Sequence, residues 1–202
     1  YNQDNIANSG FGIPYAVLGF TGKAFDKVSF NLSINAAKSG GQLLQQAWFD
    51  VKFKEAAQLR VGKFKTPFSH AYLTTLGETL FPQLPTSLTT AVIMPYTLNA
   101  VTPNIGTGFD LGVELHGLVK DKFGYEICLF NGTGAAVNTA SKTMSDDWHI
   151  PSLLYAGRFT YMPYGVMPST QGNPNRLDEK KMLIGVSGSI NVESENESTN
   201  DT

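Results

Sequence analysis

Cysteine is almost absent from this sequence, since Cys128 is its single cysteine among 202 residues. One cysteine excludes an intrachain disulfide framework and a zinc site made of several cysteine thiolates. Charged residues are scarce as well, at 16% against roughly 25% in an average soluble domain. The formal net charge of −2 contains no excess of positive charge, so the sequence predicts no nucleic-acid partner.

Two further absences concern membrane helices and catalysis. No run of about 18 apolar residues is present, so no transmembrane helix is predicted. No Ser-His-Asp arrangement, HExxH string or CxxCH string occurs, so the sequence predicts no enzyme and no cofactor. Glu114 and His116 are two residues apart and share a face of a strand, but two ligands do not make a metal site.

The most informative feature that is present is alternation between apolar and polar residues. It runs from Val28 to Ala36, from Phe109 to Val119 and from Phe123 to Leu129. A period of two is typical of a β-strand with one apolar and one polar face. In a soluble β-sandwich the apolar face packs on a second sheet. In an outer-membrane barrel it faces lipid, while the polar face lines a water-filled lumen.

The pattern predicts eight strands. They span residues 14–22, 27–37, 42–54, 58–66, 106–119, 123–131, 151–163 and 181–192. Most are longer than the average soluble strand of about five or six residues. They match the roughly 9–11 residues that a tilted strand needs to cross a bilayer. The predicted fold class is therefore all-β, an antiparallel transmembrane β-barrel.

The connections between these strands differ in length. The short ones are 23–26, 55–57 and 120–122, and the long ones are 67–105 and 132–150. Short periplasmic turns and long extracellular loops are typical of a bacterial barrel. The acidic, polar residues 193–202 predict a mobile extracellular tail. Because eight strands leave both ends on the outer side, residues 1–202 are expected to form a partial outer-membrane barrel.

Three segments of the sequence resemble a known family. They are QAWFDVKF at 46–53, LRVGKFKTPF at 59–68 and GYEICLFNGTG at 124–134. Together they resemble the phosphate-selective porin O and P family, over roughly residues 27–192. The resemblance implies a homotrimeric channel in the bacterial outer membrane that passes anions and contacts the membrane lipid. Its barrel would have about sixteen strands, of which this chain would supply half.

When the apolar face of each strand is set outward, charged residues face the lumen. The predicted pore-lining residues are Lys27, Asp50, Lys52, Lys54, Arg60, Asp110, Glu114, His116, Glu126 and Arg158. Five Lys or Arg residues stand against four Asp or Glu residues, so weak ion selectivity is predicted. A phosphate filter needs several Arg or Lys donors close together, and this set does not show them.

The connection 67–105 is predicted to fold into the barrel and constrict it. Long connections inside compact folds often bind or cover a site, and the prolines of this one exclude a ladder strand. Its apolar residues would be unfavourably exposed in a free extracellular loop. The predicted constriction residues are Phe68, Tyr72, Glu78, Phe81 and Tyr96. Packing of this loop on a neighbouring subunit remains the alternative.

The sequence therefore predicts an outer-membrane porin that passes small polar solutes or anions by passive diffusion. Two alternatives stay open. One is a barrel that serves as a scaffold or sleeve for a partner in a larger envelope complex. The other is a soluble β-sandwich binding module. An open lumen would favour the porin, and a lumen filled by another chain would favour the scaffold.

Overall fold

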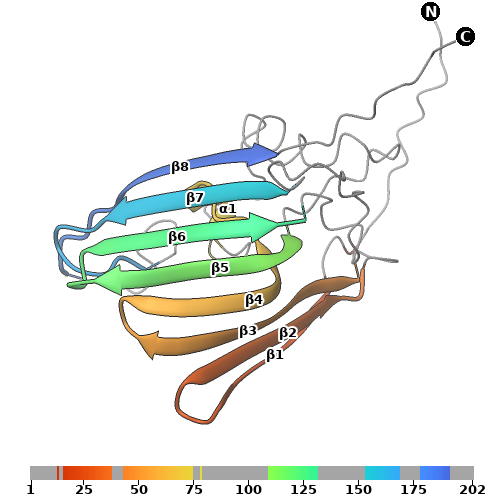
Figure 1. The fold of residues 1–202 in the computed structure, drawn as a ribbon. Helices are drawn as coiled ribbons and strands as arrows, with labels where there is room; N and C mark the ends of the chain where they lie inside the picture. Colours follow the sequence, from red (N-terminus) through yellow and green to blue (C-terminus); the bar gives the residue numbers. More distant parts are fainter. Residues whose placement is uncertain are drawn as a thin grey trace, which may run out of the picture.

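The computed structural model describes residues 13, 16–37, 43–74, 78, 109–131, 153–168 and 178–191. Its elements are β1 (Val17–Ala24), β2 (Val28–Asn35), β3 (Leu44–Lys54), β4 (Ala57–Lys65), α1 (His70–Leu73), β5 (Phe109–Val119), β6 (Phe123–Phe130), β7 (Leu154–Tyr161) and β8 (Ile184–Asn191). The strands form one eight-stranded sheet in the order of the sequence (Figure 1). No helix in the described part of the chain is long and apolar enough to span a membrane.

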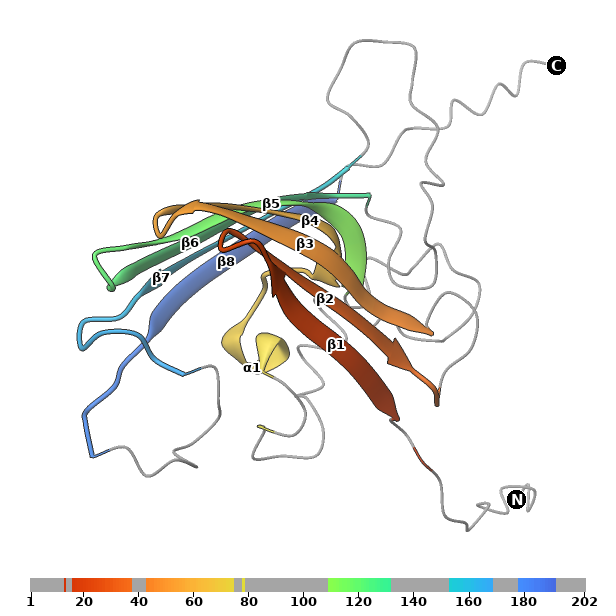
Figure 2. The ribbon, with the colours of Figure 1, turned by 90° about the horizontal axis from the view of Figure 1, so that it is seen from below.

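The sheet is arched, with a convex and a concave face (Figure 2). Each strand pairs antiparallel with the next one in sequence, and β1 and β8 are the two open edges. The prediction of an all-β fold with eight antiparallel strands is confirmed, and the arched meander is that of a partial barrel wall. The described residues contain one sheet and not two packed sheets, so the β-sandwich alternative is wrong.

All eight predicted strands are present, with ends that differ by a few residues. The first strand is shifted along the chain, since it runs from Val17 to Ala24 and not over 14–22. Its pairing with β2 continues to Ala24 opposite Val28. The chain then reverses within three residues, where Phe25 adopts a φ of 53°. The tight turn predicted at 23–26 is therefore slightly misplaced, because pairing along β1 extends past the end of its apolar pattern.

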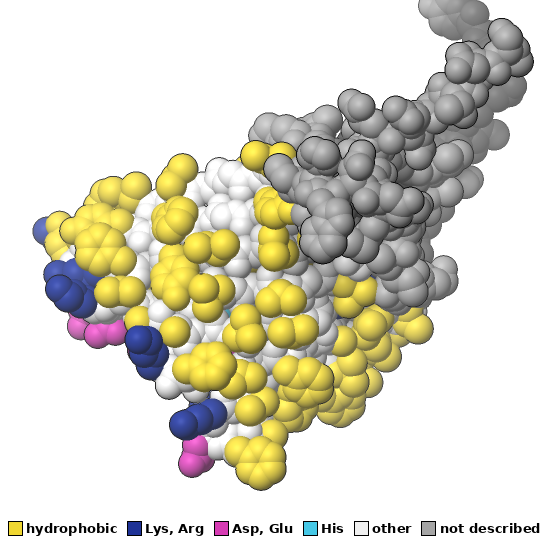
Figure 3. Space-filling view, viewed as in Figure 1, with side chains coloured by type: hydrophobic (Ala, Val, Ile, Leu, Met, Phe, Trp, Pro, Cys, Tyr) yellow, Lys and Arg dark blue, Asp and Glu magenta, His cyan; other side chains and the backbone are white. Residues whose placement is uncertain are grey.

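The convex face carries the apolar side chains of the alternating pattern. Leu32, Phe49, Val113, Ile127 and Leu129 are exposed there, as predicted. Phe30, Val51 and Leu111 share that face but are half-buried, and the ring of Phe30 lies over Gly22. Figure 3 shows this face, where hydrophobic side chains cover the strands and charged ones lie at the edge formed by the short turns.

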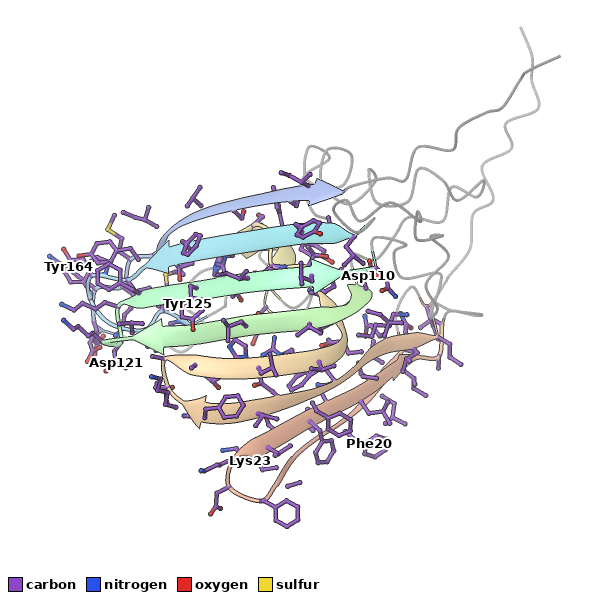
Figure 4. The ribbon with its side chains drawn as sticks, viewed as in Figure 1. Phe20, Lys23, Asp110, Asp121, Tyr125 and Tyr164 are labelled. Carbon is purple, nitrogen blue, oxygen red and sulfur yellow. The ribbon has the colours of Figure 1, made fainter. Side chains whose placement is uncertain are left out.

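A tyrosine crosses the convex face near the turns. Tyr125 on β6 pairs with Gly117 on β5, and its hydroxyl donates to the Ala56 carbonyl at 2.7 Å (Figure 4). Ala56 belongs to the turn between β3 and β4. A Cβ atom at position 117 would lie 2.5 Å from the carbonyl carbon and oxygen of Ala56. Glycine is required there because the turn packs directly on the β5 backbone.

We expect Gly117→Ala to lower the free energy of unfolding by about 1–3 kcal/mol, the range for overpacking of a tight contact. Gly188→Ala on β8 is the matched control, since a Cβ atom there meets nothing within 4 Å. Urea unfolding of the refolded protein in detergent micelles, followed by tryptophan fluorescence, measures both. Equal effects at the two positions would contradict this account of Gly117.

Candidate functional site

The concave face carries charged residues in two rows that run across the sheet from β3 to β7. Residues paired across neighbouring strands point to the same face, so the register defines each row. The first row is Asp50, Arg60, Glu114, Cys128 and Ala156, and the second is Lys52, Gln58, His116, Glu126 and Arg158. Charges that are far apart in the sequence are therefore neighbours on one surface.

Arg60 stands at the centre of the first row and binds a carboxylate on each side. Its Nε and Nη2 donate to Asp50 Oδ2 at 3.2 and 2.8 Å, and its Nη1 donates to Glu114 Oε2 at 3.0 Å. His116 Nε2 lies 2.8 Å from the same Asp50 oxygen. The Glu114 side chain is 2% exposed and that of Asp50 is 7% exposed, so both carboxylates are buried, whereas Arg60 is 25% exposed.

Aromatic rings cover the guanidinium of Arg60. Its central carbon lies 4.7 Å from the centre of the Trp48 ring and 5.7 Å from the centre of the Phe64 ring. A cation over the face of an aromatic ring is attracted by the electrons of the ring. Arg60 is thus held by two carboxylates along its edges and lies near two aromatic rings.

The other two cations of the rows are also ion-paired. Arg158 Nη1 donates to Glu126 Oε2 at 3.0 Å. Lys52 pairs with Glu55 in the turn between β3 and β4, where both side chains are well exposed. The carboxylates bound to Arg60 are therefore the most buried, and the Lys52–Glu55 pair at the turn is the most exposed to solvent.

An apolar cluster on the concave face includes the last two residues of the first row and continues toward the loop side. It consists of Phe64, Cys128, Phe130, Leu154 and Ala156, with Trp48 packed against it. The five members other than Trp48 are buried, with exposed fractions between 1% and 6%. The ring of Phe130 lies over Gly112, where a Cβ atom would be 2.4 Å from its Cδ1. Glycine at that position lets the ring lie flat on the wall.

The chain that follows β4 turns onto the concave side, where α1 lies beneath the arch (Figure 2). The backbone N–H of Ser69 donates to Ser187 Oγ on β8 at 3.3 Å. Lys65 Nζ donates to the Tyr72 carbonyl at 2.9 Å and lies over the rings of Tyr72 and Phe109. The segment from residue 66 to residue 74 is therefore held at both β4 and β8, four strands apart.

Comparison with known proteins identifies the family to which the chain belongs. The model of the family described as "Phosphate-selective porin O and P" matches residues 1–202, the whole chain. The chain belongs to this family. No curated protein and no solved structure matches it. The resemblance noted in the sequence is thus confirmed, and the family is one of bacterial outer-membrane porins, which are channels rather than enzymes.

In a porin wall the concave face lines the lumen and the convex face meets lipid. Seven of the ten predicted pore-lining residues lie in the two concave rows of this porin: Asp50, Lys52, Arg60, Glu114, His116, Glu126 and Arg158. Lys27 and Lys54 are exposed at the turn end. Asp110 is buried near the loop end, opposite Phe64.

Three of the predicted constriction residues fall within the described part of the porin. Tyr72 is buried, Phe68 is half-buried and Glu78 is exposed. Phe81 and Tyr96 lie outside the described residues, as does the predicted tail 193–202.

Two contributors to the concave face escaped the sequence analysis. Lys23 is in β1, opposite Ser29, which itself pairs with Asp50, so it extends the first row. The alternation in β2 could have revealed Lys23. It sets the register of the β1–β2 hairpin, and that register places Lys23 opposite Ser29. Ser187 faces the segment after β4, and an uncharged serine in an apolar strand offers no such signal.

Glu114 and His116 have different side-chain partners. Glu114 binds Arg60, whereas His116 binds Asp50. Among the described residues no group of three or more His, Cys, Asp or Glu side chains is arranged to hold a metal ion.

Proposed function

We propose that this chain forms part of the wall of an outer-membrane channel through which small polar solutes, including anions, diffuse passively. The observation that carries the proposal is the contrast between the two faces of one arched sheet. The convex face exposes large apolar side chains, and the concave face carries rows of charge. Lipid stabilises the first and a water-filled lumen the second.

Aromatic side chains at the turn end support this placement. Phe25, Phe123 and Tyr164 are exposed there, and Phe123 stacks on Tyr161 with ring centres 5.0 Å apart. Tyrosine and other amphipathic rings are enriched where a membrane meets water. The short turns would then mark one membrane boundary. In a bilayer the open edges along β1 and β8 need further strands to satisfy their backbone groups.

We further propose that the connection 67–105 narrows this lumen. Its described start lies on the concave side and is hydrogen-bonded to Ser187 of β8. The apolar cluster around Phe64 and Phe130 is buried on a wall that would otherwise face water. An apolar segment folded inward would cover such a cluster, because burial removes both surfaces from water.

We expect deletion of residues 76–93 to raise the single-channel conductance while the barrel still assembles, because loops contribute little to the strand ladder. The deletion leaves the anchoring contacts of Lys65 and Ser69 in place. Planar-bilayer recordings of the purified full-length porin measure conductance, and electrophoretic mobility with and without heating measures assembly.

An unchanged conductance in an assembled deletion variant would contradict the narrowing. If a partner protein were lost on purification at the same time, the scaffold alternative would account for the loop instead. Ser187→Ala is a second test of the same idea. Without its hydroxyl the Ser69 N–H loses its acceptor on β8, and the recordings should become noisier as the segment moves.

A further inference from the structure

We propose that Asp50 and Glu114 determine the ion selectivity of this wall by occupying Arg60, so that its guanidinium does not bind permeating anions. The inference rests on the proposed function, since it assumes that the concave face meets the ion path. It assigns a specific role to Asp50 and Glu114, which cannot be derived from the overall charge of the lumen.

The geometry of Arg60 carries the first step. A guanidinium recognises anions through N–H groups along its edges. Here Nε and Nη2 point at Asp50, and Nη1 points at Glu114, with all three distances between 2.8 and 3.2 Å. The Trp48 and Phe64 rings lie over the guanidinium within 4.7 and 5.7 Å. An anion would have to displace a buried carboxylate to reach these donors.

The charge balance of the two rows carries the second step. Between β3 and β7 they hold three carboxylates and three cations, with His116 counted as neutral. Arg158 is paired with Glu126 and Lys52 with Glu55. The rows therefore offer a permeating anion neither an excess of positive charge nor an uncommitted arginine. Removing the charges of Asp50 and Glu114 would create an excess of positive charge and an arginine without a charged partner, both at Arg60.

The burial of the carboxylates carries the third step. Asp50 Oδ1 is buried with no hydrogen-bond partner among the described residues, and the contacts of Asp50 with Arg60 and with His116 both fall on Oδ2. Glu114 is 2% exposed and meets Arg60 through Oε2. These carboxylates are held against Arg60 and not in the lumen, so their main electrostatic effect is on that arginine.

The test is the reversal potential of the full-length porin in a potassium chloride gradient across a planar bilayer. We expect the native protein to discriminate weakly between chloride and potassium. In Asp50→Asn/Glu114→Gln the chloride-to-potassium permeability ratio should rise about fivefold, the change in local anion concentration that one unit charge exerts at about 4 Å in water. Asparagine and glutamine keep an acceptor oxygen for Arg60, and heat-modifiable mobility verifies folding. The single variant Glu114→Gln, which keeps the Asp50 pair, should give a smaller rise in the same direction.

Two controls test whether the rise depends on the place of the removed charge and on the presence of Arg60. Asp121→Asn removes an exposed charge in the turn between β5 and β6 and should leave the ratio unchanged. Adding Arg60→Met to the double variant should return the ratio toward the native value. A double variant with the native ratio, or a triple variant that keeps the full rise, would overturn the inference while leaving a conducting porin. Absence of conductance from the native protein would overturn the proposed function itself.

Discussion

Arg60→Met is expected to destabilise the folded porin by about 3–5 kcal/mol, the cost of leaving buried charge uncompensated. Methionine retains an unbranched apolar stem but lacks the guanidinium that lies over Trp48, so the loss reports on the removal of that charged group. Glu114 would keep its 2% exposure without its cationic partner, and Asp50 would retain only His116. Urea unfolding in micelles at neutral pH measures the free energy.

Arg158→Met is the matched control for this prediction. Its partner Glu126 is 27% exposed and can be solvated by water when the pair is broken, so a loss of about 1 kcal/mol is expected. The triple variant Arg60→Met/Asp50→Asn/Glu114→Gln should recover most of the stability, because neutral groups replace the whole buried network. If Arg60→Met and Arg158→Met lost similar amounts of unfolding free energy, the burial of Glu114 and Asp50 would not explain the effect of Arg60→Met.

Val113→Arg is expected to cost about 2–4 kcal/mol, the penalty for a charge at the middle of the lipid-facing band. Val113 is 41% exposed on the convex face near the centre of β5. Its neighbours in the same cross-strand row are Val61 and Leu129, both exposed and apolar. The same unfolding measurement, made in lipid vesicles, gives the cost.

Val119→Arg tests the depth dependence on the same strand and the same face. Val119 ends β5 next to the turn, where an arginine side chain can reach water, so a cost of about 0–1 kcal/mol is expected. A large penalty at both positions would argue against a membrane boundary at the turns. No penalty at Val113 would contradict the lipid-facing assignment of the convex side.

The alternation of apolar and polar residues was sufficient to predict all eight strands, their antiparallel order and the seven predicted pore-lining residues that lie in the two concave rows. Val28 to Asn35 and Phe123 to Phe130 show why. In a strand with a period of two, the apolar residues must share one face, so the face of every other side chain follows. Strands joined by tight turns then pair with their neighbours in the sequence. The family resemblance was also visible in the sequence. One of the motifs that carry it, from Leu59 to Phe68, covers most of β4 and the first residues after it.

The pairing of charges was decided only by the tertiary structure. Arg60 and Glu114 are 54 residues apart in sequence, and His116 and Asp50 are 66 apart. Which cation meets which carboxylate depends on the register across β3, β4 and β5, and on side chains such as Trp48 that restrict where Arg60 can lie. The sequence alone predicted a nearly neutral lumen wall. On the concave face of the fold, the charges of the two rows form specific ion pairs.

The course of the chain after β4 was decided in the same way. Composition predicted that the connection 67–105 is buried, since apolar residues without charge are unfavourable in water. It left open whether the lumen or a neighbouring subunit provides the burial. The described part of that connection lies on the concave side because Ser187, on a strand more than a hundred residues later, accepts a hydrogen bond from Ser69. Local pattern thus determined the strands and their faces, while contacts between distant strands determined the charge network and the position of residues 66–74 on the concave side.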